Sequence, residues 1–225
     1  IPARSVMPYA TWTATKRNLQ ALREAGWSLF ITPDVAFRLL DGRDHHARWD
    51  DGSLAPYALD NGAWGCFQKG KPFDFDRFCK MVEVYGDRAD FICAPDVVEG
   101  GLDSLAISLE WVDRLRPVGR VLIPVQDGMT SRDLRPHIGP DVGIAVGGST
   151  DWKEISTPRW GRLCAEMGAY LHVLRVNTCR RIAICAGAGA HSFDGTSATR
   201  FSKNVPRLNN ARKQLSLLAP RGEDV

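Results

Sequence analysis

The sequence contains no apolar run long enough to cross a bilayer. A membrane-spanning helix needs roughly 18 or more consecutive apolar residues, and every apolar run in this chain is shorter. The first residues also lack the charged and then apolar pattern of a secretory leader. We therefore expect a soluble protein of the cytoplasm that has no membrane partner.

Spacings typical of metal sites are missing as well. The 5 histidines form no HxH, HExxH or HxxxH pair, and the 6 cysteines form no CxxC pair. Metal motifs depend on such spacings because they bring two ligands to one face of a turn or helix. The sequence therefore predicts no metal site, no cofactor and no disulfide framework, with the cysteines as reduced thiols in apolar segments.

What the chain does contain is a regular alternation of short β-rich runs with amphipathic stretches. Its 225 residues, 44% of them hydrophobic, suffice for one large core, and alternating βα units are typical of a parallel sheet. The expected strands are Val6–Ala10, Trp27–Ile31, Tyr57–Leu59, Phe91–Ala94, Val121–Val125, Gly143–Val146, Leu171–Val176 and Ser192–Phe193. We predict an α/β fold, namely a compact single-domain (β/α)8 TIM barrel over residues 1–225.

Helical periodicity is clear over Thr13–Ala25, Asp74–Tyr85, Leu102–Leu115 and Val205–Leu218. The last of these belongs to a basic C-terminal helix and tail, residues 205–225. The polar and turn-rich segment 41–55 is expected to form a long loop over the mouth of the barrel.

Five short polar segments stand where apolar runs end. They are LDNG at 59–62, APDV at 94–97, VQDG at 125–128, VGGS at 146–149 and SFDG at 192–195. Each has an ordinary explanation, because Asp, Asn and Gly favour turns, Asp96 can cap a helix, and glycine-rich loops can bind phosphates or carbonyl oxygens. In a parallel barrel, however, all strand ends meet at one mouth, where such enzymes keep their chemistry.

Asp60, Asp96 and Asp194 would then converge with the amide of Gln126. Burial of unpaired carboxylates is costly, so their clustering indicates a ligand or a reaction that uses them. Two acids can serve as nucleophile and general acid/base at an anomeric carbon, while a third carboxylate and an amide can read the edge of a nitrogen heterocycle. Trp64, which follows the first polar segment, could stack on a flat base at the mouth.

The distribution of charge points to a polyanionic partner. The net charge is only +3, but Asp194 is the single acid between Arg175 and Arg221. The basic residues that we expect to bind phosphates are Arg175, Arg180, Arg181, Arg200 and Lys203. A solvated helix face, balanced by acids elsewhere in the fold, is the alternative interpretation.

At these positions the sequence resembles the queuine and archaeosine tRNA-guanine transglycosylases, and more closely the DpdA-type DNA-guanine transglycosylases of phages and bacteria. LDNGAW at 59–64 resembles the family's Asp-Ser-Gly-Gly-aromatic segment, with Asn61 and Ala63 as departures. The other matching segments, in order, are PD at 95–96, VQDG at 125–128, AVGGS at 145–149, LHVL at 171–174 and SFDGTSATR at 192–200.

The resemblance implies a TIM barrel and a covalent exchange of bases. Asp194 would be the nucleophile toward C1′ of deoxyguanosine, and Asp60 the general acid/base. A 7-deazaguanine base would replace guanine, and the residues that bind the base would be Asp96, Gln126, Gly147, Gly148 and Trp64. The protein would be a pentosyltransferase of the cytoplasm, or of the host cytoplasm if it is phage-encoded.

The C-terminal part of the chain departs from the tRNA enzymes. They carry a CxCxxC and a distant His in a zinc subdomain, whereas no cysteine or histidine follows Phe201 here. The resemblance therefore favours DNA over tRNA as the partner, with the target nucleotide flipped or single-stranded. Three alternatives stay open: the same exchange on tRNA, a base-releasing N-glycosidase on the same barrel, and a non-catalytic nucleic-acid-binding barrel.

Overall fold

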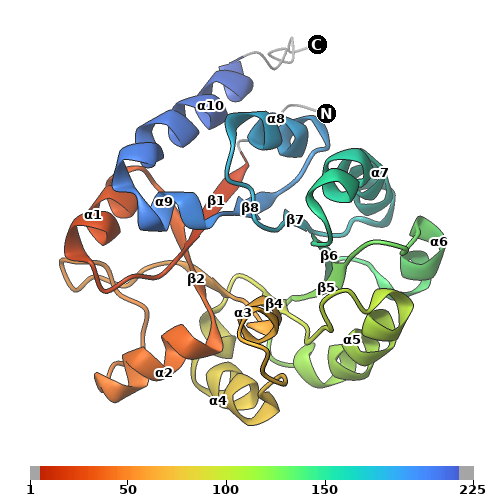
Figure 1. The fold of residues 1–225 in the computed structure, drawn as a ribbon, viewed down its shortest axis with the longest axis horizontal. Coiled ribbons are helices and arrows are strands. Elements are labelled where there is room, and N and C mark those ends of the chain that lie inside the picture. Colours follow the sequence, from red (N-terminus) through yellow and green to blue (C-terminus); the bar gives the residue numbers. More distant parts are fainter. Residues whose placement is uncertain (1–5, 218–225) are drawn as a thin grey trace.

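The computed structural model describes residues 6–217 and forms a closed barrel of parallel strands (Figure 1). Within these residues the strands are hydrogen-bonded in sequence order, and β8 pairs with β1 to close the ring. Their bounds are β1 Met7–Thr11, β2 Ser28–Ile31, β3 Tyr57–Leu59, β4 Ile92–Cys93, β5 Val121–Val125, β6 Val142–Val146, β7 Leu171–Val173 and β8 Ser192–Asp194. The predicted α/β TIM barrel is confirmed.

Helices surround the barrel on its outer side (Figure 1). In chain order they are α1 Lys16–Glu24, α2 Pro33–Asp41, α3 Ala63–Gln68, α4 Phe75–Tyr85, α5 Gly101–Leu115, α6 Ser131–Leu134, α7 Thr150–Met167, α8 Cys179–Gly187, α9 Thr196–Arg200 and α10 Val205–Leu217, with short 3-10 helices at Gly86–Arg88, Arg135–His137 and Ser202–Asn204. The helices predicted at 74–85, 102–115 and 205–218 correspond to α4, α5 and α10; the predicted tail at 218–225 lies outside the described residues. None of the helices in the described part of the chain is both long and apolar enough for a bilayer crossing.

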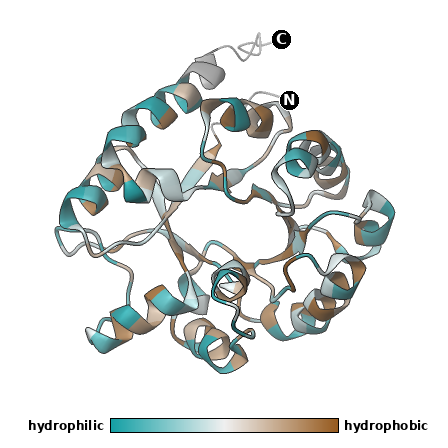
Figure 2. Cartoon of the chain, viewed as in Figure 1, coloured by the Kyte–Doolittle hydropathy of each residue, from teal (hydrophilic) through white to brown (hydrophobic). Residues whose placement is uncertain are grey.

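Apolar side chains form two layers of core. Inside the barrel, Tyr9, Phe30, Phe91 and Leu122 pack with small residues. A larger layer, to which Ala10 contributes from the other side of β1, separates the strands from the helices. Figure 2 shows hydrophilic residues mainly on the outward sides of the helices, which is the amphipathic pattern that docks a helix against a sheet.

The polar segment that we expected over the mouth lies at the opposite end of the barrel. Because α2 follows β2 almost directly, segment 42–56 runs from the end of α2 back to the start of β3. It is anchored there, since Trp49 is buried and the Tyr85 hydroxyl donates to the Asp44 carbonyl at 2.8 Å. The prediction was wrong because residues 33–41 were not identified as a helix, although a Thr-Pro-Asp sequence at their start is typical of a helix N-terminus.

Two further expectations need correction. Strand β7 ends at Val173 and not at Val176, and two residues later Arg175 adopts a left-handed backbone conformation with φ 58°, which interrupts regular strand geometry. The structure forms no disulfide among the six cysteines, all of which lie within its described residues, and Cys79, which we expected with the others to be a core thiol, is exposed on α4. The cysteines are therefore not all core residues.

Gly161 lies where α7 packs against the end of α8, so a substitution at this position tests that contact. A Cβ at this position would collide with the carbonyl group of Ala188. Gly161→Ala should therefore lower the free energy of unfolding by about 1–3 kcal/mol, the usual cost of an overpacked contact, in urea unfolding followed by circular dichroism. Gly187→Ala is the matched control, because its Cβ would have nothing within 4 Å; an equal loss in both variants would contradict the close contact.

Candidate active site

Three carboxylates meet at the mouth of the barrel, where the strands end. Asp60 follows β3, Asp96 follows β4, and Asp194 is the last residue of β8. Burial raises the pKa of the Cys93 thiol, and the charges of Asp60, Asp194 and Asp96 add to that effect. The structure therefore brings together the three acids that the sequence placed at separate strand ends.

Asp60 is the acid best suited to exchange a proton near neutral pH. Burial, followed by the charges of Asp194 and Asp96, raises its pKa to about 7. The Gly62 N–H donates to Oδ1 at 3.5 Å and partly offsets this effect. A carboxyl with a pKa near the working pH can act as both general acid and general base.

Asn61 holds Asp96 in place. Its Nδ2 donates to Asp96 Oδ1 at 2.8 Å and to the Ala94 carbonyl at 2.6 Å, while its Oδ1 accepts from the Ala63 N–H at 2.9 Å. Burial raises the pKa of Asp96 to about 6, against the lowering effects of the Asn61 hydrogen bond and the Arg175 charge. From the sequence, Asn61 was interpreted as a turn residue and as a departure from the family motif; an amide directly after a strand-end carboxylate was the available signal.

Asp194 is fixed through one of its two oxygens. Oδ1 accepts the Arg175 backbone N–H at 2.9 Å and lies 3.3 Å from His172 Nε2. The residue is 6% exposed. Within residues 6–217 no hydrogen bond engages Oδ2, so this oxygen is available to a ligand.

Gln126 supports the loop after β4. Its Nε2 donates to the Val97 carbonyl and to Ser104 Oγ, both at 2.9 Å, which uses both of its hydrogens. In this arrangement the amide nitrogen that we assigned to base recognition is already occupied by protein groups.

Gly147 and Gly148 form the turn between β6 and α7. The Gly147 N–H donates to the Val125 carbonyl at 2.8 Å and so belongs to the sheet. Gly148 has φ 72°, and a Cβ there would collide with the Asp127 carboxylate, which accepts from the Ser149 N–H at 2.7 Å and from its hydroxyl at 2.6 Å. Of the two glycine amides assigned to the base, the Gly148 N–H is the one that no described residue engages.

Arg175 links the nucleophile candidate to the rim of the mouth. Besides its N–H bond to Asp194, its guanidinium donates to the Gly148 carbonyl at 2.6 Å and lies 4.2 Å from the centre of the Trp64 ring. Trp64 is 39% exposed and stacks on Phe67 with ring centres 5.7 Å apart. The predicted aromatic platform is therefore at the mouth, with Arg175 over its ring.

The other predicted phosphate-binding residues divide into two groups. Arg180 and Arg181 form ion pairs with Glu154 of α7, at 3.0 and 2.9 Å. Arg200 and Lys203 are exposed shortly after β8, and no acid in the described part of the chain pairs with them. They are the exposed members of the predicted set that no acid of the described residues neutralises.

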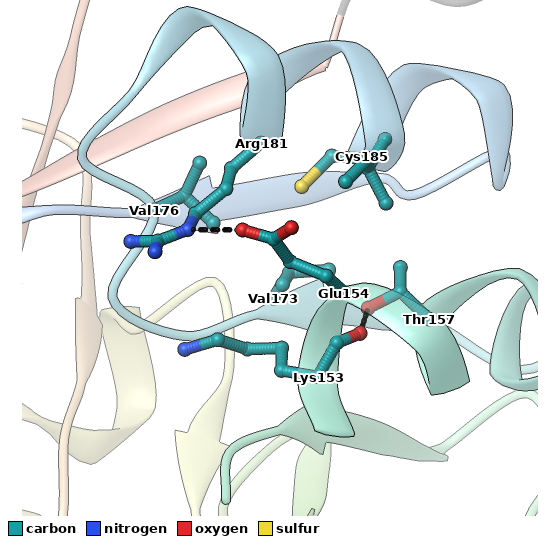
Figure 3. A pocket seen from close by; sticks show the side chains of 8 residues that line it. Lys153, Glu154, Thr157, Val173, Val176, Arg181 and Cys185 are labelled. Carbon is teal, nitrogen blue, oxygen red and sulfur yellow. Dashed lines mark hydrogen bonds and ion pairs between the residues drawn. The ribbon is translucent and has the colours of Figure 1, made fainter. Parts of the chain in front are cut away.

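A buried lysine that the sequence did not single out lies beside the site. Lys153 is 3% exposed, and its Nζ donates to the Leu174 carbonyl at 2.7 Å. Burial, followed by the charge of Arg175, lowers its pKa to about 8. Figure 3 shows it in a small pocket between α7 and α8 that also holds the ion pair of Arg181 with Glu154. Lys153 thus supports the loop that carries Arg175.

Comparisons with known proteins add no family to this description. A scan of protein-family models gives no match, and a search of curated proteins finds no relative of the chain. Among residues 6–217, no group of three or more His, Cys, Asp or Glu side chains could hold a metal ion. The functional interpretation therefore rests on the geometry of the mouth.

The raised pKa values of Asp60 and Asp96 predict a loss of stability as the pH rises. Both acids have a pKa above the ordinary value of 3.8 in the folded protein, so between about pH 4 and 7 the folded state binds more protons than the unfolded state. The free energy of unfolding therefore falls as the pH rises through this range. Asp60→Asn cannot ionise and should be more stable than the wild type by about 2 kcal/mol at pH 8, and nearly equal to it at pH 4. Urea unfolding at the two pH values measures the difference.

Asp127→Asn is the control, and we expect it to change the free energy of unfolding at pH 8 in the opposite direction. Although partial burial opposes them, hydrogen bonds from Ser149 lower the pKa of Asp127, so its charged form stabilises the fold above the unfolded pKa of about 4. This variant should be less stable than the wild type at pH 8. An Asp60→Asn protein that also loses stability at pH 8 would contradict the electrostatic description of the mouth.

Proposed function

We propose that this protein is a DNA-guanine transglycosylase that exchanges guanine in DNA for a 7-deazaguanine base. The observation that supports the proposal is the pairing of Asp194, which has an unengaged carboxylate oxygen, with Asp60, whose pKa is about 7. Base exchange through a covalent intermediate needs a nucleophile and a group that both gives and takes a proton. These two side chains meet both needs.

In the first step, Asp194 Oδ2 attacks C1′ of the target deoxyguanosine. The C1′–N9 bond breaks, its electron pair leaves with guanine, and Asp60 gives a proton to the leaving base. The product is a glycosyl ester of Asp194. In the second step, the incoming base attacks C1′, Asp60 takes a proton from it, and the Asp194 carboxylate is released; the two displacements retain the configuration at C1′.

Asp96 reads the base. A guanine-type base presents N1–H and an exocyclic amine on one edge, and a carboxylate offers two acceptors to these two donors. Asn61 donates a hydrogen bond to this carboxylate and orients it, and in this proposal the Gly148 N–H donates to O6. Gln126 contributes by holding the loop that carries Asp96. A two-point contact of this kind contributes about 1–3 kcal/mol of discrimination.

The nucleic acid approaches over the basic side of the mouth. C1′ of a stacked nucleotide is not accessible, so the target nucleotide is flipped or arrives single-stranded. Arg200 and Lys203, which follow the nucleophile in the chain, bind the flanking phosphates, and affinity therefore falls steeply with salt. Trp64 and Phe67 offer apolar rings to a neighbouring base.

One incorporation assay separates this proposal from its alternatives. Labelled cyano-, aminomethyl- and amidino-7-deazaguanines are offered with single-stranded DNA, duplex DNA and tRNA. Label in DNA supports the proposal, and label in tRNA alone would reassign the nucleic acid. Release of guanine without incorporation would favour the N-glycosidase, and salt-sensitive binding without either reaction would favour a binding barrel.

Asp194→Ala should abolish the covalent adduct between protein and DNA, because no other described group takes the place of Oδ2. The adduct is trapped under denaturing conditions and separated by electrophoresis. Asp127→Asn, which alters another acid of the same mouth, should still form it. An undiminished adduct with Asp194→Ala would refute the assignment of the nucleophile.

Asp96→Ala should weaken binding of a free 7-deazaguanine base by about tenfold or more, because both base donors lose their acceptors. Isothermal calorimetry measures the affinity, and thermal unfolding checks that the variant folds. Asp103→Ala, which removes an exposed acid from the first turn of α5, is the control and should bind as the wild type does. Equal affinity of Asp96→Ala and the control would count against base reading by Asp96.

A further inference from the structure

The side chain of Arg175 crosses the mouth of the barrel. Arg175 follows β7, and its guanidinium lies 4.2 Å from the centre of the Trp64 ring, which α3 carries shortly after β3. Because the strands pair in sequence order around a closed ring, β3 and β7 lie on opposite sides of it, and Figure 1 shows α3 across the ring from β7. The contact between Arg175 and Trp64 therefore spans the mouth.

The guanidinium also reaches the residues that are proposed to read the base. It donates to the Gly148 carbonyl at 2.6 Å, and Gly148 carries the N–H that no described residue engages. Burial raises the pKa of Asp96, whereas the Asn61 hydrogen bond and then the charge of Arg175 lower it. The positive charge therefore lies within electrostatic reach of Asp96.

The backbone around Arg175 is fixed in place. The Arg175 N–H donates to Asp194 Oδ1 at 2.9 Å, and the Leu174 carbonyl accepts from Lys153 Nζ at 2.7 Å. The N–H of the following residue, Val176, donates to the Asp194 carbonyl at 2.6 Å. The side chain can therefore leave the mouth by rotating about its own bonds, without a change in the backbone that holds Asp194.

Neutral groups alone hold the Arg175 side chain. No acid among residues 6–217 forms an ion pair with it, whereas Arg180 and Arg181 both pair with Glu154. A guanidinium has five N–H donors, and the hydrogen bond to Gly148 is the one that a described residue accepts from this side chain. A phosphate offers a negative charge and two parallel hydrogen bonds to such a group. A phosphate can therefore draw Arg175 away from its neutral partners.

The guanidinium also lies where a base would stack. It is a flat group that packs on aromatic faces, as unpaired bases do. Phe67 stacks on the same Trp64 ring, with ring centres 5.7 Å apart, which limits the surface that remains for another flat group. A base that stacks on Trp64 at the mouth therefore competes with Arg175.

We propose that the Arg175 side chain is a strap across the mouth and that a phosphate of the nucleic acid releases it; this inference rests on the proposed function. The guanidinium leaves Trp64 and the Gly148 carbonyl and pairs with the phosphate, and the target base takes its place on the ring. The nucleic acid stays attached to Asp194 after guanine leaves, so the strap remains released for the incoming base. Without nucleic acid, the strap makes a free base a weaker ligand.

Proton–nitrogen NMR of the arginine side chains tests the strap without any reaction. A ring that lies against the guanidinium shifts the Arg175 Nε–H signal upfield, so Trp64→Leu should move this signal downfield. Saturating single-stranded DNA should move the wild-type signal in the same direction, because the guanidinium leaves the ring and binds a phosphate. An Arg175 signal that stays in place in either experiment, with DNA bound in the second, would overturn the strap.

Two affinities should change in opposite directions in Arg175→Ala. Binding of free 7-cyano-7-deazaguanine should strengthen by about threefold or more, because the base no longer has to displace a side chain. Binding of single-stranded DNA should weaken, and the slope of log affinity against log salt should fall by about one, since one phosphate contact is lost. Calorimetry measures the first affinity and fluorescence anisotropy the second.

Arg200→Ala is the matched control. It removes an exposed guanidinium that is also proposed to bind a phosphate, so it should weaken DNA binding in the same way. Its affinity for the free base should equal that of the wild type, because Arg200 has no contact with Trp64 or Gly148 among the described residues. A rise in base affinity in both variants would contradict a specific role of Arg175.

The outcomes separate a failed strap from a failed function. If the wild type binds neither nucleic acid nor base, the proposed function is wrong and release of the strap falls with it. If the wild type binds both, and Arg175→Ala loses affinity for both or keeps its affinity for the base, the strap is wrong and the function stands. The NMR comparison of the wild type with and without DNA decides the strap even if Arg175→Ala does not fold.

Discussion

Closure of the barrel between β8 and β1 is the constraint on which the mouth depends. In the register of this pair, Met7 lies beside Ser192 and Tyr9 beside Asp194. In an open sheet, β3 and β8 would be separated by five strand spacings, about 24 Å in all. Asp60 and Asp194 would then lie too far apart to contact one ligand. Because the ring closes, both acids instead lie at one mouth, and the charge of Asp194 raises the pKa of Asp60.

The same closure brings the carboxylates close together, and neighbouring groups stabilise their charges to different extents. Carboxylates this close repel one another and lose hydration, so the pKa values of Asp60 and Asp96 rise. Asp96 receives the Asn61 amide, and Asp194 receives the Arg175 N–H and the His172 ring. The three carboxylates therefore differ in the neighbouring groups that donate to them.

A second layer of residues holds these supports in place. The left-handed conformation of Arg175 aims its N–H at Asp194 and its guanidinium at Gly148 and Trp64, and Lys153 fixes the carbonyl of the residue before it. Buried polar groups of this kind cost stability unless they are all satisfied. The barrel interior thus holds buried polar contacts, such as that of His172 with Ser192, among its apolar side chains.

The sequence by itself determined the fold class, the order of strands and the three acids at their ends, because alternation, helical periodicity and turn residues are local properties of the chain. The segment predicted as a loop over the mouth, 41–55, was placed at the wrong end of the barrel, because its position depends on α2 forming before it. The contacts of Gln126 with Val97 and Ser104, of His172 with Ser192 and of Tyr9 with Asp90 join residues 20 to 81 positions apart. Only the closed tertiary structure decided these, because local pattern cannot specify which distant partner a buried polar group will find.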